Sequence, residues 1–389
     1  MQEGRRRFLL LATALAAVPL ARADAPEASA VTAVLRHYAR LVHSSYADTL
    51  SQARLLQRSV RRFLAAPDEA ALARARAAWI AARECYGQTE AFRFYGGPID
   101  AADGPEPRIN AWPVDESFID AVRGRPEAGL IQQRGLPLDR ATLIRLNTFD
   151  GEENIATGWH AIEFLLWGQD FSASGPGERP ARDFLDGQAP NADRRRRYLA
   201  LVTELLVDDL AGLVAAWAPG RANYRRRFEA MGSEGLRAIL IGLGSLASAE
   251  LAGERLQVAL ASREQEDEQS CFSDNTHRDI VADALGLQNV WLGRYQPLQG
   301  ALLQGPALRD LVALRDIALA ERLSAALAEA LAAAEAIQPP FDREILGGAD
   351  APGRQRLQRV VTALLRTTGL LVEAARLLGI NKLSWVRKA

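Results

Sequence analysis

The chain has 389 residues, and its 47 Lys and Arg residues nearly balance its 48 Asp and Glu residues, for a formal net charge of −1. Nucleic-acid binding requires a clustered excess of basic side chains, so this balance excludes nucleic acid as a partner. The length favours two domains, and a hydrophobic content of 48%, rich in Ala and Leu, favours a large helical core.

The first 23 residues predict an export signal. Arginines at 5–7 precede an apolar run at 8–20, and Ala-Arg-Ala follows at 21–23. The run is too short for a membrane span, which needs about 20 residues, so we expect cleavage after Ala23 and release into the periplasm. The arginines also resemble a twin-arginine signal, which would imply export of a folded protein.

Helical periodicity dominates the first half of the remaining chain. Helices are expected over 30–64, from Asp68 to about Tyr95, and over 154–167, where Gly168 ends the last one. Shorter helical segments are expected at 116–123 and 138–146. Residues 98–115 contain four prolines and predict an ordered loop that carries Trp112.

The second half follows a connection at 172–192 that is rich in Gly and Pro. Helices are expected over five further stretches, namely 194–217, 222–262, 276–292, 306–337 and 353–379. We therefore predict an all-α protein of two similar antiparallel four-helix-bundle domains, at 28–190 and 191–389. A short repeat supports two similar halves: Arg83-Glu84 and Arg263-Glu264 each precede a phenylalanine by the same interval.

The stretch "TGWHAIEFLLWGQD", residues 157–170, places His160 three residues before Glu163. On a helix both side chains project from one face, so the two can share one metal ion such as iron, zinc or copper. The spacing alone is equally compatible with core packing. The apolar flanks predict burial, and a buried carboxylate needs a partner such as a cation. Gly158 would allow a neighbouring backbone to approach closely.

Acidic residues gather in two other places. "SREQEDEQSCFSDNT", residues 262–276, contains five carboxylates, among them Glu264 and Asp267, and predicts either a solvated face or part of a site. Glu90 and Asp115 lie next to aromatic residues, and Asp115 is also suited to cap the helix that follows it.

Several catalytic and ligand-binding motifs are absent from the sequence. The chain has no His-Glu-x-x-His zinc motif, no Gly-x-Ser-x-Gly elbow, no phosphate-binding loop and no dinucleotide fingerprint. Cys85 and Cys271 have no nearby Cys or His at metal-ligand spacing. In an oxidising compartment these two cysteines either form a disulfide or stay as free thiols, and the sequence leaves both alternatives open.

Four blocks together resemble the imelysin-like family, also classed as M75 peptidases. Its Gly-x-His-x-x-Glu hallmark is matched by residues 158–163, and family-like blocks occupy 78–100, 108–120 and 262–280. The resemblance implies an all-helical fold of two similar bundles, with a functional site at their interface and a role in periplasmic iron uptake. It further implies that His160 and Glu163 are metal ligands, with other acids and supporting residues around them. The other acids are Glu90, Asp115 and Asp267, and the supporting residues are Gly158, Trp112, Arg83, Arg263 and Glu264.

The expected function is therefore an exported periplasmic iron-binding protein without catalysis. Zinc or copper are alternatives to iron, and the expected partner is an inner- or outer-membrane iron transport component. One alternative is a metallopeptidase in which Glu163 acts as base on a metal-bound water. Another is a helical scaffold that binds haem or a partner protein.

Overall fold

The structure is a computed structural model that describes residues 28–172 and 174–385. Its described part is mostly helical, which confirms the all-α prediction. A short antiparallel pair, β1 (Arg294–Tyr295) and β2 (Leu303–Gln304), forms the one sheet among these residues. The predicted export signal lies outside the described residues.

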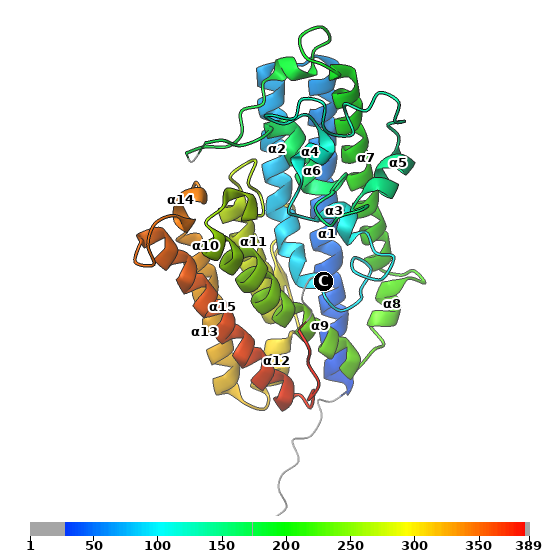
Figure 1. Ribbon diagram of the computed structural model, residues 1–389. Helices are drawn as coiled ribbons and strands as arrows, with labels where there is room; N and C mark the ends of the chain where they lie inside the picture. Colours follow the sequence, from blue (N-terminus) through cyan, green and yellow to red (C-terminus); the bar gives the residue numbers. More distant parts are fainter. Residues whose placement is uncertain (1–27, 173, 386–389) are drawn as a thin grey trace, which may run out of the picture.

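Three long helices stand side by side in the first group of elements (Figure 1): α1 (Ala28–Ala65), α2 (Glu69–Gly87) and α7 (Ala192–Trp217). Helix α2 begins where the Asp68 side chain accepts a hydrogen bond from the Ala71 N–H at 2.6 Å. Shorter elements lie in the connections around these helices. They are η1 (Gln88–Phe92), α3 (Glu106–Ile109), α4 (Glu116–Ile119), α5 (Arg140–Leu146), α6 (Gly158–Trp167), η2 (Ala181–Phe184) and α8 (Tyr224–Phe228).

A second group of helices packs around α11 (Thr276–Leu292), α13 (Ile317–Glu335) and α15 (Pro352–Leu377), to the left of α1 in Figure 1. The other elements of this half are α9 (Ser233–Ser245), η3 (Leu246–Gln257), α10 (Val258–Ser262), η4 (Gln265–Asp267), α12 (Leu308–Ala313) and α14 (Asp342–Ile345).

Two of the predicted long helices are broken in the structure. The stretch 222–262 is interrupted at Gly232, whose φ of +58° departs from helical geometry. The stretch 306–337 is interrupted before Asp316, which caps α13 by accepting from the Leu319 N–H at 2.8 Å. Residues Ser233–Ser262 form one continuous helix that is long and apolar enough to cross a membrane, but 83% of its most apolar window is buried within the fold, as in a core helix.

Helix α7 packs along α1, although the predicted domain boundary at 190/191 assigns these helices to different halves. The division into two domains at that boundary stays a prediction.

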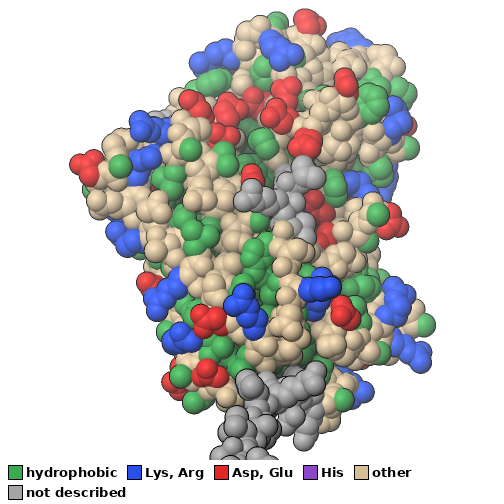
Figure 2. All heavy atoms as spheres, turned by 60° about the horizontal axis from the view of Figure 1, so that its bottom comes forward, with side chains coloured by type: hydrophobic (Ala, Val, Ile, Leu, Met, Phe, Trp, Pro, Cys, Tyr) green, Lys and Arg blue, Asp and Glu red, His purple; other side chains and the backbone are tan. Residues whose placement is uncertain are grey.

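On the face shown in Figure 2, Lys and Arg side chains are dispersed, whereas Asp and Glu side chains gather in its upper part.

Candidate metal site

Helix α6 carries the His-x-x-Glu motif through the middle of the fold, and all of its residues are buried. Its first residue, Gly158, has a φ of +90°, and a Cβ there would lie 2.5 Å from the Ile109 carbonyl oxygen. The position therefore requires glycine, and the close backbone approach expected from the sequence is present. Gly168, at φ +75°, ends the helix.

His160 and Glu163 form a buried pair on one face of α6. His160 Nδ1 lies 2.8 Å from Glu163 Oε2, and the two side chains are 1% and 0% exposed. The other carboxylate oxygen, Glu163 Oε1, accepts from the Ser273 backbone N–H at 2.9 Å and from the Ser273 hydroxyl at 2.7 Å. Burial raises the pKa of Glu163 to about 8, although the Ser273 hydrogen bonds act in the opposite direction.

The loop that carries Ser273 is fixed by a buried ion pair. Arg83 Nε donates to Asp279 Oδ1 at 3.0 Å, and the Ser270 hydroxyl donates to Asp279 Oδ2 at 2.5 Å. Arg83 Nη1 also donates to Asn110 Oδ1 at 2.6 Å, which connects the loop before α11 to the proline-rich segment. Arg83 thus joins α2, α11 and the segment around Asn110, and its supporting role at the site stays a prediction.

Glu90 belongs to a different cluster. Its Oε2 accepts from Arg93 at 2.6 Å and from Arg255 at 2.5 Å. Burial alone would raise its pKa, but the two guanidinium groups hold the pKa of Glu90 at about 2. Glu90 is hydrogen-bonded to these arginines rather than to His160 or Glu163, so its role as a ligand stays a prediction.

Asp115 caps α4, because its Oδ1 accepts from the Ser117 N–H at 2.9 Å and from the Ser117 hydroxyl at 2.6 Å. Asp267 lies half-buried in η4. The pKa of Glu266 is raised mainly by burial, and the nearby carboxylates of Asp267 and Asp115 raise it further. The two acidic loops around Asp115 and Asp267 therefore face each other. The remaining supporting residues are Trp112, buried in the proline-rich segment, and Arg263 and Glu264, both exposed.

Cys271 connects these acidic loops to the buried pair. Burial raises the pKa of its thiol, and Glu163, Glu268, Glu266 and Glu116 raise that pKa further. Because all four carboxylates act on one thiol, the loop acids lie near Glu163. Cys85 and Cys271 are both free thiols in the structure.

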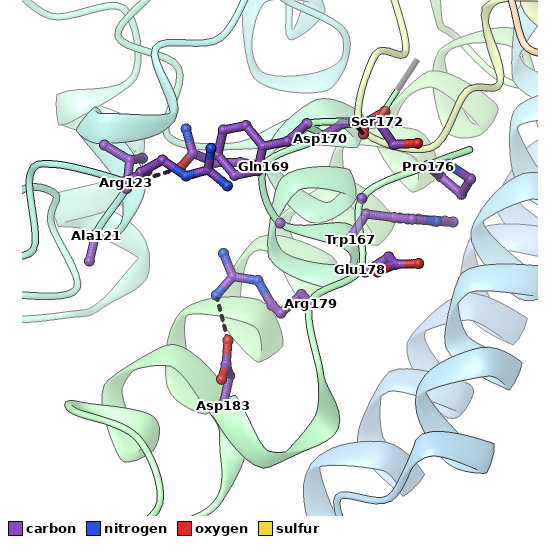
Figure 3. A pocket seen from close by; sticks show the side chains of 14 residues that line it. Ala121, Arg123, Trp167, Gln169, Asp170, Ser172, Pro176, Glu178, Arg179 and Asp183 are labelled. Atoms are coloured by element: carbon purple, nitrogen blue, oxygen red, sulfur yellow. Dashed lines mark hydrogen bonds and ion pairs between the residues drawn. The ribbon is translucent and has the colours of Figure 1, made fainter. Parts of the chain in front are cut away.

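A groove of about 490 Å³ opens beyond the C-terminal end of α6 (Figure 3). Its lining includes Arg123, Trp167, Asp170 and Arg179, but neither His160 nor Glu163. Arg179 is held there by Asp120 at 3.1 Å. The groove is therefore distinct from the buried pair, although both depend on α6.

The donor set of the pair suits a transition-metal ion. Two ligand atoms that each lie roughly 2.1 Å from a metal, at a right angle, are about 3 Å apart. In the structure His160 Nδ1 and Glu163 Oε2 lie 2.8 Å apart in a hydrogen bond, and an ion bound by both atoms would replace that hydrogen bond. Ser273 then holds the second carboxylate oxygen, as outer hydrogen-bond donors do around bound metals. Sequence reasoning missed Ser273, although it lies within the acidic block 262–276.

Comparison with known proteins decides the family. The family model described as Imelysin (Peptidase_M75) matches residues 42–371. The chain belongs to the imelysin family. It is 25% identical over 324 residues to iron-regulated protein A from Synechococcus elongatus, with coverage of 79% of this chain and 75% of the relative.

Two solved structures share the fold of this imelysin-family chain. One is a protein from Parabacteroides distasonis, provisionally described as an iron-regulated protein A precursor, with a TM-score of 0.68, 18% identity and coverage of 90% of this chain and 96% of that one. The other is an imelysin-like protein from Psychrobacter arcticum 273-4, with a TM-score of 0.66, 17% identity and coverage of 91% and 97%.

Proposed function

We propose that this protein is an exported, periplasmic iron-binding protein of an iron-acquisition system, and that it performs no catalysis. The observation that supports this most is the buried pair of His160 and Glu163, with its imidazole and carboxylate ligand atoms 2.8 Å apart. The relation to iron-regulated protein A, by its name, favours iron over zinc or copper.

In this proposal iron is the cargo, and His160 and Glu163 are its first two ligands. The two donors of Ser273 orient the Glu163 carboxylate. The facing acidic loops, with Asp115, Glu266 and Asp267, raise the local concentration of cations through their negative potential. Asp115 and Asp267 are the candidates for completing the coordination, and a membrane iron transport component is the proposed recipient.

The test is calorimetric titration of the mature chain, residues 24–389, with Fe(II), Fe(III), Zn(II) and Cu(II). One iron ion per chain is expected. His160→Ala and Glu163→Gln are expected to weaken iron binding at least about tenfold, because each removes a ligand. His43→Ala, at a half-buried histidine of α1, is the matched control and keeps parental binding. Equal iron binding by all four proteins would overturn the proposal.

The same preparations distinguish the alternatives. Chelator-sensitive cleavage of an unfolded protein by the metal-loaded chain, abolished in Glu163→Gln, would support the metallopeptidase instead. A haem absorbance shift in a chain that does not bind iron would support the scaffold. The iron-binding proposal expects neither.

A further inference from the structure

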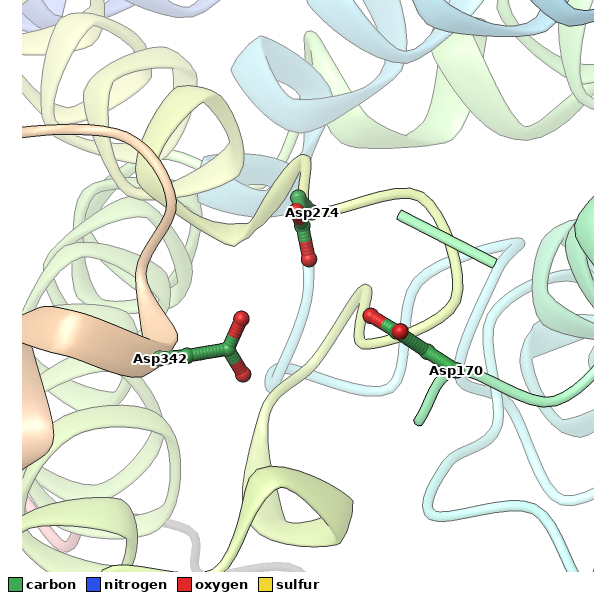
Figure 4. Close-up of side chains that lie close together, drawn as sticks. All are labelled: Asp170, Asp274 and Asp342. Carbon is green, nitrogen blue, oxygen red and sulfur yellow. The ribbon is translucent and has the colours of Figure 1, made fainter. Parts of the chain in front are cut away.

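Three aspartates from distant parts of the chain converge beside the loop that precedes α11 (Figure 4). Asp170 follows α6, Asp274 lies just before α11, and Asp342 begins α14. One carboxylate oxygen from each lies within 4.8 Å of the other two. In Figure 4 the Asp342 side chain points toward the other two carboxylates.

A fourth carboxylate, Glu268, is an independent indication of a missing partner. Its side chain is buried; among the described residues it contacts the Thr276 hydroxyl and the carboxylates of Asp342 and Asp274, and no Arg, Lys or His forms an ion pair with it. Burial has the largest effect on the pKa of Glu268 and raises it. The neighbouring carboxylates of Asp342 and Asp274 raise the pKa of Glu268 further. Burying a carboxylate among other carboxylates is costly unless it takes up a proton or a cation, and a bound cation removes the cost for the whole cluster at once.

The surroundings supply little positive charge to this four-carboxylate cluster, made of Asp170, Glu268, Asp274 and Asp342. Arg343 lowers the pKa of Asp342 to some extent, but its side chain is exposed. Burial and the neighbouring carboxylates raise the pKa of Asp274 to about 7. The polar donors on Asp170 are neutral, namely the Gln265 amide at 2.6 Å and the Ser172 N–H at 2.8 Å.

We propose that this four-carboxylate cluster binds one Ca²⁺ ion, at a site separate from His160 and Glu163. All its ligand atoms are carboxylate oxygens, which hard cations prefer over the softer zinc and copper. Ca²⁺ takes oxygens at about 2.3–2.6 Å, so ligands on opposite sides of the ion are about 4.6–5.2 Å apart. The oxygens of Asp170, Asp274 and Asp342 lie within 4.8 Å of one another, which is no farther apart than the ligands of one Ca²⁺ ion can be.

The ion would tie together three segments: the end of α6, the loop before α11 and the start of α14. Asp274 directly follows Ser273, the residue that donates twice to Glu163. Occupancy by Ca²⁺ therefore fixes the loop that orients the Glu163 carboxylate. The Ca²⁺ proposal does not depend on iron binding by His160 and Glu163.

The test is calorimetric titration of the metal-free mature chain with CaCl2 at neutral pH, combined with thermal unfolding. The parent is expected to bind one Ca²⁺ and to show a Tm that rises with Ca²⁺ concentration. Asp342→Asn removes a ligand and is expected to weaken Ca²⁺ binding at least about tenfold. Asp350→Asn, at an exposed aspartate of the following loop, is the matched control and retains parental binding.

Two further variants keep the outcome decisive. Asp170→Asn, at a half-exposed ligand position, gives the same loss of Ca²⁺ binding even if Asp342→Asn folds poorly. Glu163→Gln keeps Ca²⁺ binding while it loses iron, which separates the two proposals. No Ca²⁺ binding by the parent at millimolar concentration, binding of Mn²⁺ or Mg²⁺ in its place, or parental Ca²⁺ affinity in both ligand variants would overturn the assignment.

Discussion

Glu90 and Glu268 are the same residue type at the same depth, each 1% exposed, yet their surroundings are opposite. Glu90 accepts hydrogen bonds from two arginines, and its pKa falls to about 2. Glu268 lies among carboxylates, and burial raises its pKa well above the usual range. A buried carboxylate that arginines of the chain neutralise is structural, whereas one left among other acids must take up a proton or bind a cation.

The pair of His160 and Glu163 lies between these extremes. Glu163 has two neutral donors from Ser273 and an imidazole neighbour, and its pKa rises to about 8. These neighbours orient the Glu163 carboxylate, but none of these donors is an arginine or lysine that would balance its negative charge. That combination is typical of a binding site.

The largest effect is expected where the arginine cluster is broken. Arg255 pairs with Glu90, Glu250 and Asp283, at 2.5, 2.8 and 2.6 Å. Arg255→Met leaves these buried carboxylates without that partner and is expected to lower the free energy of unfolding by about 3–5 kcal/mol. Urea unfolding of the parent and the variant measures this loss of stability. Arg61→Met, at an exposed pair, is the control, with an expected change of about 0.5 kcal/mol or less; equal losses in both variants would contradict the comparison.

A matched pair of substitutions tests the comparison of Glu90 with Glu268. Glu90→Gln is expected to destabilise the protein by about 2–3 kcal/mol at neutral pH, because it leaves two buried guanidiniums less compensated. Glu268→Gln is expected to leave the metal-free protein as stable as the parent or more stable, because a charge at this position is unfavourable and Gln carries none. Thermal unfolding in the presence of a chelator measures both. A larger loss in Glu268→Gln than in Glu90→Gln would reverse the interpretation.

The difference in the free energy of unfolding between the parent and Glu163→Gln is expected to depend on pH. The pKa of Glu163 is raised from 4.5 to about 8, so the folded protein retains a proton that the unfolded chain releases. This contribution to stability is fully present below pH 4.5 and is lost as the pH rises through about 8, by about 1.4 kcal/mol per pH unit. Urea unfolding of both metal-free proteins from pH 5 to about 9 measures it. A difference that does not change with pH would contradict the environment described for Glu163.

The smallest effect is expected at Ser273. Ser273→Ala removes the hydroxyl donor and leaves the backbone N–H in place, so the Glu163 carboxylate is less well oriented. Iron affinity is expected to fall by about 10-fold, within the range for outer-shell donors. Ser262→Ala, at an exposed serine of the same half, is the control and keeps parental affinity. An unchanged affinity in Ser273→Ala would mean that the backbone N–H alone fixes Glu163.

The sequence predicted the helical class and most of the helix positions, because apolar periodicity, caps and glycines act locally. The Asp68 cap and the end of α6 at Gly168 followed from such local signals, whereas α6 begins at Gly158 and not at residue 154 as predicted. The breaks at Gly232 and Asp316 were missed, since apolar residues at helical spacing continue on both sides of each break.

Of the contacts at the site, the sequence predicted only the pairing within the His-x-x-Glu motif. His160 and Glu163 lie three residues apart, so their pairing was visible from the sequence. Contacts such as that of Ser273 with Glu163 join residues more than a hundred positions apart, and they depend on how the loop before α11 folds back onto α6. For the same reason the convergence of Asp170 and Asp342 had no signal in the sequence.

The most direct test of the account is a crystal structure of the mature protein loaded with iron and calcium, with anomalous maps on both sides of the iron absorption edge. We expect an iron peak in contact with His160 and Glu163, and an ion at the four-carboxylate cluster without the iron edge signal. An iron peak at that cluster, with none beside His160, would contradict the assignment of both sites.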